Sequence, residues 1–255
     1  IFLKESLIPS IEHLVTTIDE KASTLTQATK TGRTHLMDAM PVTLEQTITT
    51  WGQQVQFALS QIKSVQKNIQ TLALGGTAVG TGINTHSDFA VQAVRELSRI
   101  SNIEFTNPES FFPLMSSQDI AVSLSGALKT MAVSLMKLSN DLRWMNSGPL
   151  AGLGEITLEA LQPGSSIMPG KVNPVIPEST AMVCAEVIGN DTTITVAGQS
   201  GNFELNVMLP IIAEKLICSL KILSTSSRLL ADKAIKTFKV NSQNLEGPLD
   251  RNPIL

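Results

Sequence analysis

Apolar residues recur along much of the chain in alternating steps of four and three, which is the spacing of one helix face. One such row runs from Trp51 to Leu72, and a second runs from Leu124 to Leu142. A row with this spacing packs against neighbouring helices in the manner of a coiled coil. The pattern predicts two long helices, with buried rows at Trp51, Val55, Ala58, Ile62, Val65, Ile69 and Leu72 and at Leu124, Leu128, Met131, Leu135, Leu138 and Leu142.

Further helices are expected toward both ends of the chain. A helical pattern begins close to the first residue, with Leu7, Ile11, Leu14 and Ile18. Another helix follows Pro177, and one more runs from about Pro210 through Leu230. Long helices packed along such rows cross at shallow angles of about 20°. We therefore expect an all-α fold, an elongated bundle of long helices in which strands have little room.

The last of these helices is apolar on more than one side, at Leu216, Ile217, Leu220, Ile222 and Leu223. We expect this surplus apolar surface to be covered on oligomerisation, which would build a larger helical core. Residues 1–238 are expected to form the central helical-bundle domain, and residues 239–255 the start of a truncated C-terminal region. Because a helical pattern begins almost at Ile1, we expect an internal part of a longer polypeptide.

Composition and charge narrow the choice of partners. The chain has 255 residues, of which 42% are hydrophobic and 16% charged, and its net charge is -3. It therefore lacks the basic field that attracts nucleic acid. No run approaches the ~18 uninterrupted apolar residues that cross a membrane. Cys184 and Cys218 have no ligand-like spacing, so we assign neither a disulfide nor a metal site to them.

Three loops between the predicted helices have compositions that packing does not explain. Residues 31–39 form a polar turn that carries the imidazole of His35. Residues 74–82 are rich in glycine, but no strand precedes them and no Gly-Lys-Ser/Thr ending follows, which excludes a nucleotide-binding loop. These glycines are expected to let helices and a neighbouring active-site loop approach closely. Residues 163–174 read Pro-Gly-Ser-Ser-Ile-Met-Pro-Gly-Lys-Val-Asn-Pro.

The third loop resembles the signature of the fumarase and aspartase superfamily. That signature is Gly-Ser-Ser, any residue, Met-Pro, any residue, Lys, any residue, Asn-Pro, and residues 164–174 match it at every fixed position. The segment from Thr31 to Asp38 also resembles the Gly-Arg-Thr-His segment of that family, and the similarity extends in order along essentially the whole chain. The resemblance implies a lyase that works without a metal or an organic cofactor.

Within that superfamily, the chain is more similar to class II fumarases than to aspartases. Gly170, residues 74–82 and residues 200–207 carry this likeness, since aspartases typically have Ala at the position of Gly170. Residues 175–178 are instead closer to the aspartase version, and Leu150 stands where both groups commonly have Arg. The resemblance implies reversible conversion of (S)-malate to fumarate and water, a step of the tricarboxylic acid cycle. The alternatives are an aspartate ammonia-lyase and a catalytically incomplete helical oligomerisation core.

The chemistry of such a lyase sets requirements for the site. Removing a proton next to a carboxylate places a second negative charge on that carboxylate, so the site needs a base, fixed donors and an acid. The resemblance implies that Ser165 is the base, that His35 activates the water or leaving hydroxyl, and that Glu178 pairs with that histidine. It further implies that the substrate-binding residues are Thr34, Ser166, Lys171, Val172 and Asn173.

The resemblance also carries expectations about assembly and location. It implies a homotetramer in which each active site draws residues from three subunits, so that the His35 region and the Ser165 loop meet across an interface. Members of the family have a further substrate-binding segment, rich in Ser and Asn, in a region upstream of residue 1. The implied location is the bacterial cytoplasm, or the mitochondrial matrix in a eukaryote.

Overall fold

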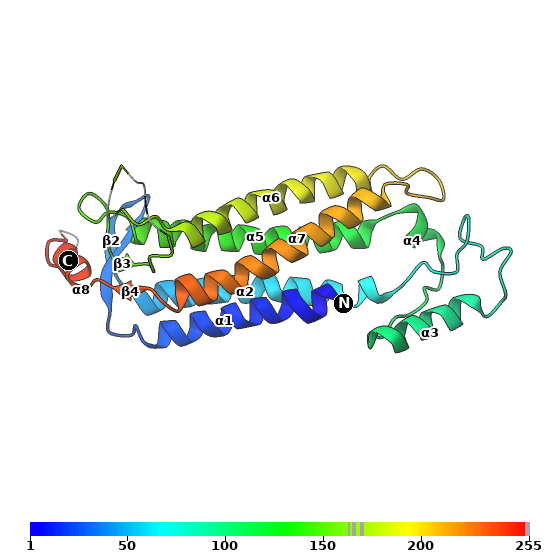
Figure 1. The fold of residues 1–255 in the computed structure, drawn as a ribbon, viewed down its shortest axis with the longest axis horizontal. Coiled ribbons are helices and arrows are strands. Elements are labelled where there is room, and N and C mark those ends of the chain that lie inside the picture. Colours follow the sequence, from blue (N-terminus) through cyan, green and yellow to red (C-terminus); the bar gives the residue numbers. More distant parts are fainter. Residues whose placement is uncertain (163, 165–166, 169–170, 253–255) are drawn as a thin grey trace.

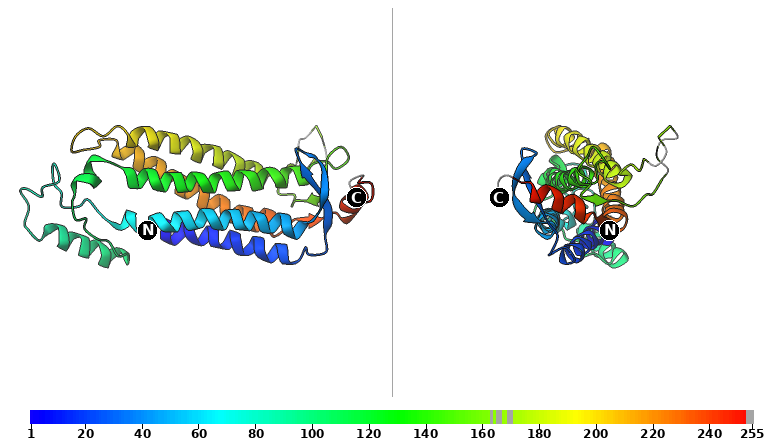
Figure 2. Two further views of the ribbon diagram at one scale, coloured as in Figure 1. Left: turned by 180° about the vertical axis from the view of Figure 1, so that it is seen from behind. Right: turned by 90° about the vertical axis from the view of Figure 1, so that its left-hand side faces the viewer.

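A computed structural model describes residues 1–162, 164, 167–168 and 171–252 of the chain. Five long helices dominate this described part and lie roughly along one axis (Figure 1). They are α1 (Ile8–Ser23), α2 (Leu44–Gln66), α5 (Asp119–Met145), α6 (Val175–Gly198) and α7 (Leu209–Leu230). Short π-helical turns extend α1 at its start (η1, Leu3–Leu7) and α7 at its end (η3, Ala231–Ile235). The expected elongated bundle is confirmed, and Figure 2 shows it end-on.

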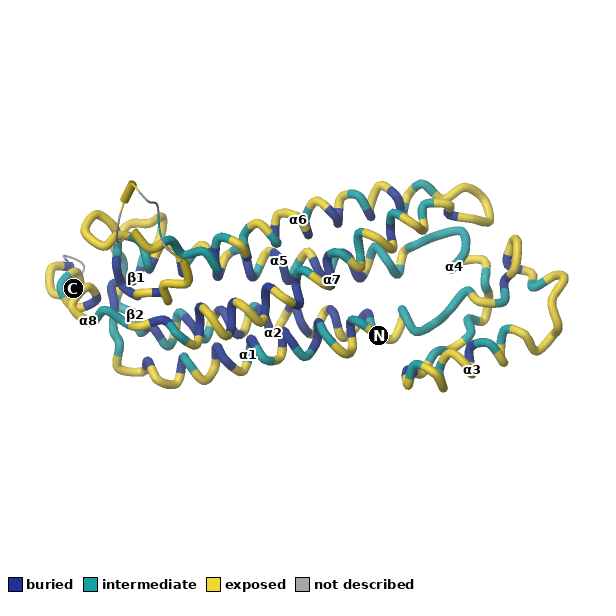
Figure 3. Tube along the Cα trace, viewed as in Figure 1, coloured by how far each residue is buried: buried dark blue, intermediate teal, exposed yellow. Residues whose placement is uncertain are grey.

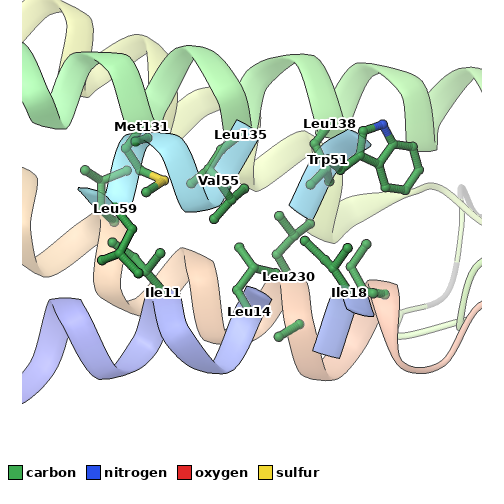
Figure 4. Packing of buried hydrophobic residues seen from close by; sticks show 14 of the residues in the cluster. Ile11, Leu14, Ile18, Trp51, Val55, Leu59, Met131, Leu135, Leu138 and Leu230 are labelled. Carbon is green, nitrogen blue, oxygen red and sulfur yellow. The ribbon is translucent and has the colours of Figure 1, made fainter. Parts of the chain in front are cut away.

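The apolar rows of the sequence form one shared core. Ile11, Leu14 and Ile18 of α1 lie close to Trp51, Val55 and Leu59 of α2, as Figure 4 shows; Met131, Leu135 and Leu138 of α5 and Leu230 of α7 complete the group. Each of these side chains is at most 1% exposed. Figure 3 shows the buried positions recurring along the inner faces of the long helices. The coiled-coil spacing therefore predicted the core-facing side of α2 and of α5.

Helix α2 ends earlier than its apolar row suggests. The α-helix stops at Gln66, a 3₁₀ turn (η2, Asn68–Gln70) follows, and the backbone is then extended. The Leu72 amide donates to the carbonyl of Thr106, and the Thr106 amide donates to the carbonyl of Gln70, at 3.0 Å each. These contacts replace helical hydrogen bonds, so the prediction that the helix reaches Leu72 is wrong.

Helix α5 passes through the middle of the bundle. It packs against α2, α6 and α7 and buries Leu124, Leu128, Met131 and the later positions of its row. By length and apolar content alone it is the one helix of the described residues that could cross a membrane. Its apolar row faces the other helices instead, which is the arrangement of a core helix.

Short strands lie at one end of the bundle, although the sequence predicted a fold with little room for strands. β1 (Thr29–Thr34) and β2 (Met37–Thr43) form an antiparallel hairpin between α1 and α2. β3 (Ile156–Thr157) pairs with β4 (Lys239–Val240), and α8 (Ser242–Asp250) packs against β1. The loop expected at residues 31–39 is therefore mostly strand. The domain boundary expected at residue 238 stays a prediction.

The glycine-rich segment lies at the opposite end of the bundle from the hairpin (Figure 1). It precedes α3 (Phe89–Ser101) and lies near α4 (Phe112–Ser116). A Cβ atom at Gly75 would lie 2.4 Å from the Cβ of Ala90, and one at Gly76 would lie 2.5 Å from the sulfur of Met115. The glycines thus allow close approach of helical residues, as expected, and the neighbours that they meet among the described residues belong to α3 and to the segment around α4.

Candidate active site

His35 lies at the tip of the β1–β2 hairpin. Thr34 pairs with Met37, so His35 and Leu36 form a two-residue turn, and both have positive φ, 54° and 60°. Positive φ at both positions is the signature of a type I′ turn, whose twist matches the flanking strands. Thr34 and His35 are exposed. Both predicted residues are therefore accessible to solvent in the single chain.

A buried carboxylate ties this hairpin to the rest of the molecule. Glu155 Oε2 accepts a hydrogen bond from Lys30 Nζ at 2.6 Å, and Glu155 Oε1 accepts one from Arg33 Nη1 at 2.7 Å. The Glu155 side chain is 2% exposed, and those of Lys30 and Arg33 are 8% and 18% exposed. Each carboxylate oxygen thus has its own cationic partner, which is the arrangement that makes a buried carboxylate tolerable.

A cavity of about 590 Å³ lies beneath the hairpin. Thr34 and Leu36 of the hairpin line it, together with Glu155, Asp141 and Trp144. The Trp51 indole donates to Asp141 Oδ2 at 2.9 Å, and the Lys137 ammonium also contacts that carboxylate. The acidic groups of this cavity are therefore paired with donors of the protein.

A larger cavity of about 980 Å³ gathers the residues that follow the signature serines. Its lining includes Lys171, Val172, Asn173 and Glu178, and also Arg143. Glu178 lies in the first turn of α6, and Lys171 to Asn173 lead into that helix. The charged lining has two cations, Arg143 and Lys171, and one anion, Glu178. The resulting excess of one positive charge suits an anionic ligand.

Ser165 and Ser166 lie outside the described residues. The backbone of the neighbouring Gly164 packs against that of Lys171, because a Cβ at position 164 would lie 1.7 Å from the carbonyl oxygen of Lys171. Only glycine allows the two backbone segments to come so close. Gly164 and Lys171, which both belong to the signature, therefore lie close together, and the roles expected of Ser165 and Ser166 stay predictions.

The predicted site residues fall into two groups within this chain. Thr34 lines the cavity beneath the hairpin, whereas Lys171, Val172, Asn173 and Glu178 line the larger one. Trp144 lines both cavities and so lies between them. In the part of the chain that the structure describes, no hydrogen bond or ion pair joins His35 to Glu178, and their expected pairing stays a prediction.

Sequence reasoning missed the group that supports the hairpin. Glu155, Lys30 and Arg33 received no role, although Arg33 lies inside the Gly-Arg-Thr-His segment. Their separation of 122 and 125 positions along the chain hides the contact from any local pattern. Among residues 1–162, 164, 167–168 and 171–252, no three His, Cys, Asp or Glu side chains gather as a metal ion would require.

Comparison with known proteins finds similarity to the same superfamily that the sequence motifs resemble. A family model described as "Lyase" matches residues 2–189. Fumarate hydratase class II 2 of Pseudomonas aeruginosa is 62% identical over 253 residues, which cover 99% of this chain and 55% of that protein. Fumarate hydratase class II of Xylella fastidiosa is 53% identical over 249 residues, which cover 98% of this chain and 53% of that protein.

Solved structures extend the likeness to the fold. The crystal structure of recombinant class II fumarase from Schistosoma mansoni matches with a TM-score of 0.95 at 36% identity, over 98% of this chain and 55% of that chain. The resemblance to class II fumarases and the helical fold are therefore confirmed. The chain spans about half the length of the curated relatives that it matches.

Proposed function

We propose that this chain, which belongs to the lyase family, is the central helical part of a hydro-lyase that interconverts (S)-malate and fumarate. The observation that carries the proposal is the convergence of Lys171, Asn173 and Glu178 on one cavity at the end of the signature loop. Relatives named class II fumarate hydratase support the choice of substrate. A dicarboxylate fits the excess positive charge of that cavity.

The proposed reaction begins with proton removal from malate. The Ser165 alkoxide takes a proton from the carbon next to one carboxylate, and the electrons of the broken C–H bond move onto that carboxylate. Lys171 and Asn173 stabilise the resulting aci-carboxylate, while Thr34, Ser166 and Val172 bind the substrate. The C–O bond then breaks and the double bond of fumarate forms. The leaving hydroxyl, activated by His35, takes a proton and becomes water.

The second part of the proposal is that the site is assembled from several subunits of a homotetramer. It is supported by the distribution of the predicted residues over two cavities and by the exposed position of His35. Glu178 of one subunit would then pair with His35 of another, which favours the charged imidazole. We further propose a cytoplasmic enzyme of the tricarboxylic acid cycle that needs no metal or organic cofactor.

The ultraviolet absorbance of fumarate tests the function directly. Malate is added to the full-length protein that carries this chain, to the same protein with Ser165→Ala, and to the chain alone. We expect absorbance to rise with the full-length protein and to rise at least about a hundredfold more slowly with Ser165→Ala. Absence of turnover in the full-length protein, or turnover in Ser165→Ala at the wild-type rate, would contradict the proposal.

An aspartate ammonia-lyase is the second candidate, because residues 175–178 read Val-Ile-Pro-Glu. The two activities differ in the leaving group, so release of ammonia from aspartate distinguishes them. Ammonia release without malate turnover would replace the first proposal by the second. A tetramer that turns over neither substrate would leave a helical assembly core.

A further inference from the structure

We propose that Glu155 is a positioning residue whose carboxylate holds the hairpin carrying Thr34 and His35 in the geometry that the reaction needs. This inference rests on the proposed function, because it assigns a purpose to the support of those residues. Glu155 would touch no substrate. It would act through Lys30 and Arg33, with which its buried oxygens make hydrogen bonds of 2.6 and 2.7 Å.

Lys30 and Arg33 lie near the two ends of β1, the strand that leads to the hairpin tip. Lys30 lies near the start of β1, and Arg33 lies directly before Thr34 and His35. Residues three apart in a regular strand point to opposite faces. The pairing of β1 with β2 shifts register between Thr31 and Arg33, and this irregularity lets both side chains reach one carboxylate. The hydrogen bonds therefore fix the strand on both sides of its distortion.

Close backbone packing accompanies this distortion. A Cβ at Gly32 would lie 2.5 Å from the carbonyl oxygen of Met40, so the two strands approach closely where the register changes. Small displacements of β1 at this point are passed on to the two-residue turn beyond it. Because a displacement of about 1 Å can cost a hundredfold in rate, support at this distance from the imidazole matters for chemistry.

Glu155 is itself firmly anchored, as a support must be. Its carbonyl accepts a hydrogen bond from the Asn241 amide at 3.0 Å. The carbonyl of the preceding Gly154 accepts hydrogen bonds from Asn241 Nδ2 at 2.7 Å and from Asn244 Nδ2 at 2.8 Å. The following residues, Ile156–Thr157, form β3 and pair with β4. The carboxylate is thus held by the chain segment that continues into the signature loop.

The position of Glu155 links the two groups of predicted site residues. Glu155 lines the cavity beneath the hairpin, whereas its neighbours Gly154 and Ile156 line the cavity that holds Lys171 and Glu178. If Glu155 only stabilised the fold, it would be enough that its ion pairs with Lys30 and Arg33 form. A positioning role further requires that turnover follow the geometry of the carboxylate while the fold is kept and the substrate affinity changes less than the rate, and this difference can be measured.

The experiment compares kinetic constants of full-length variants. Glu155→Gln removes the charge, Glu155→Asp keeps it on a shorter side chain, and Lys30→Gln removes a single ion pair. Glu159→Gln is the matched control, because Glu159 has the same charge, lies in the same segment and is exposed. We expect kcat to fall about tenfold to a hundredfold in Glu155→Gln, and less in Glu155→Asp and Lys30→Gln, while KM rises by a smaller factor because Thr34 lies on the same hairpin.

Hydrogen exchange gives a readout that does not depend on turnover. The amides of residues 29–43 are expected to exchange faster in Glu155→Gln than in wild type, and at the wild-type rate in Glu159→Gln. Lys30→Gln keeps the pair between Arg33 and Glu155, so it remains informative if Glu155→Gln does not fold.

The outcomes separate this inference from the proposed function. Absence of malate turnover in the wild-type protein would refute the function itself, and with it the purpose assigned to Glu155. Wild-type turnover together with unchanged kcat in Glu155→Gln, or in Lys30→Gln where the first variant does not fold, would overturn only the positioning role. An equal fall of kcat in Glu159→Gln would overturn it as well.

Discussion

Leu36 adopts a backbone conformation that leucine rarely tolerates. Its φ is 60°, and its side chain is 67% exposed, so packing does not hold it there. The left-handed region costs a residue with a Cβ about 1–2 kcal/mol. His35 beside it has φ of 54°. Strain of this kind gathers where a turn presents functional side chains, and the tip of this hairpin presents the proposed His35.

Replacing Leu36 by glycine tests this strain. Glycine adopts positive φ without penalty but loses more conformational freedom on folding, so we expect Leu36→Gly to stabilise the protein by about 0.5–1 kcal/mol. Urea unfolding of the variant measures the change in free energy. Met37→Gly is the control, since Met37 is also exposed but lies in β2, and it should destabilise the protein. Equal destabilisation by both would contradict the strain.

Cys184 offers a second prediction at the scale of a residue. Burial raises the pKa of its thiol to about 12, and the side chain is fully enclosed by the core. The thiolate is the reactive form, and at pH 8 a thiol with that pKa is ionised in about one molecule in ten thousand. Iodoacetamide should therefore label Cys184 only after unfolding, while the half-buried Cys218 is labelled faster in the native state. Peptide mass spectrometry measures both; rapid native labelling of Cys184 would contradict its burial.

At the level of residues, the sequence grouped predicted site residues where they are close along the chain, and their roles stay predictions. Lys171, Val172, Asn173 and Glu178 are close in sequence and line one cavity. Three of them belong to the continuous signature, and Glu178 follows it by four positions. Glu155 was not predicted, because its partners Lys30 and Arg33 are distant in sequence and no rule of spacing links them. A charge flanked by apolar neighbours at Leu153 and Ile156 was the only sign of its burial.

At the scale of the element, helix α2 begins with a complete capping box. The Thr43 hydroxyl accepts a hydrogen bond from the Gln46 amide at 3.1 Å, and the Gln46 side chain accepts one from the Thr43 amide at 2.9 Å. Two amides that lack partners inside the helix are thereby satisfied. The same residue ends β2, so the cap also sets where the hairpin passes into the bundle.

Thr43→Ala is expected to lower the free energy of unfolding by about 1 kcal/mol, because it removes the acceptor for the Gln46 amide. Equilibrium unfolding in urea measures this loss as a lower midpoint concentration, with an unchanged dependence of the free energy of unfolding on urea. Thr50→Ala is the control. The Thr50 hydroxyl donates only to the Gln46 carbonyl within the helix, and alanine has the higher helix propensity, so this change should be neutral or slightly stabilising. The same loss in both variants would exclude a special contribution of the cap.

The long helices were predictable from sequence, whereas the strands were not. Rows spaced by three and four positions marked α2 and α5, and the segment from Pro210 to Leu230 marked α7. β1 and β2 read Thr-Lys-Thr-Gly-Arg-Thr and Met-Asp-Ala-Met-Pro-Val-Thr, which have no clear alternation of apolar and polar residues. Their turn is His-Leu, without the Asn or Gly that usually marks a type I′ hairpin. Tertiary contacts, including the pair of hydrogen bonds to Glu155, replace the missing local signal.

At the scale of the whole molecule, the described residues of the proposed site are divided between two cavities. Lys171 and Glu178 lie at one cavity, and Thr34 lies at another. Exposed apolar side chains on the outer faces of the long helices, such as Val133, Met182 and Ile217, are available for contact between copies. The proposed tetramer would bring the hairpin of one subunit to the cavity of another that holds Lys171 and Glu178, and symmetry would repeat this contact in every subunit.

Mixing two inactive variants tests this arrangement. Full-length Ser165→Ala and His35→Asn are each expected to be nearly inactive, because each lacks one of the proposed catalytic groups. When the two are unfolded, mixed in equal amounts and refolded together, random assembly gives about one quarter of the sites an intact serine and an intact histidine. Malate turnover should therefore return to about one quarter of the wild-type value. Refolding each variant alone is the control, and recovery there would exclude assembly as the cause. If the mixture stays inactive although the subunits exchange, His35 and Ser165 come from one chain, and the hairpin must then reach the signature loop of its own subunit.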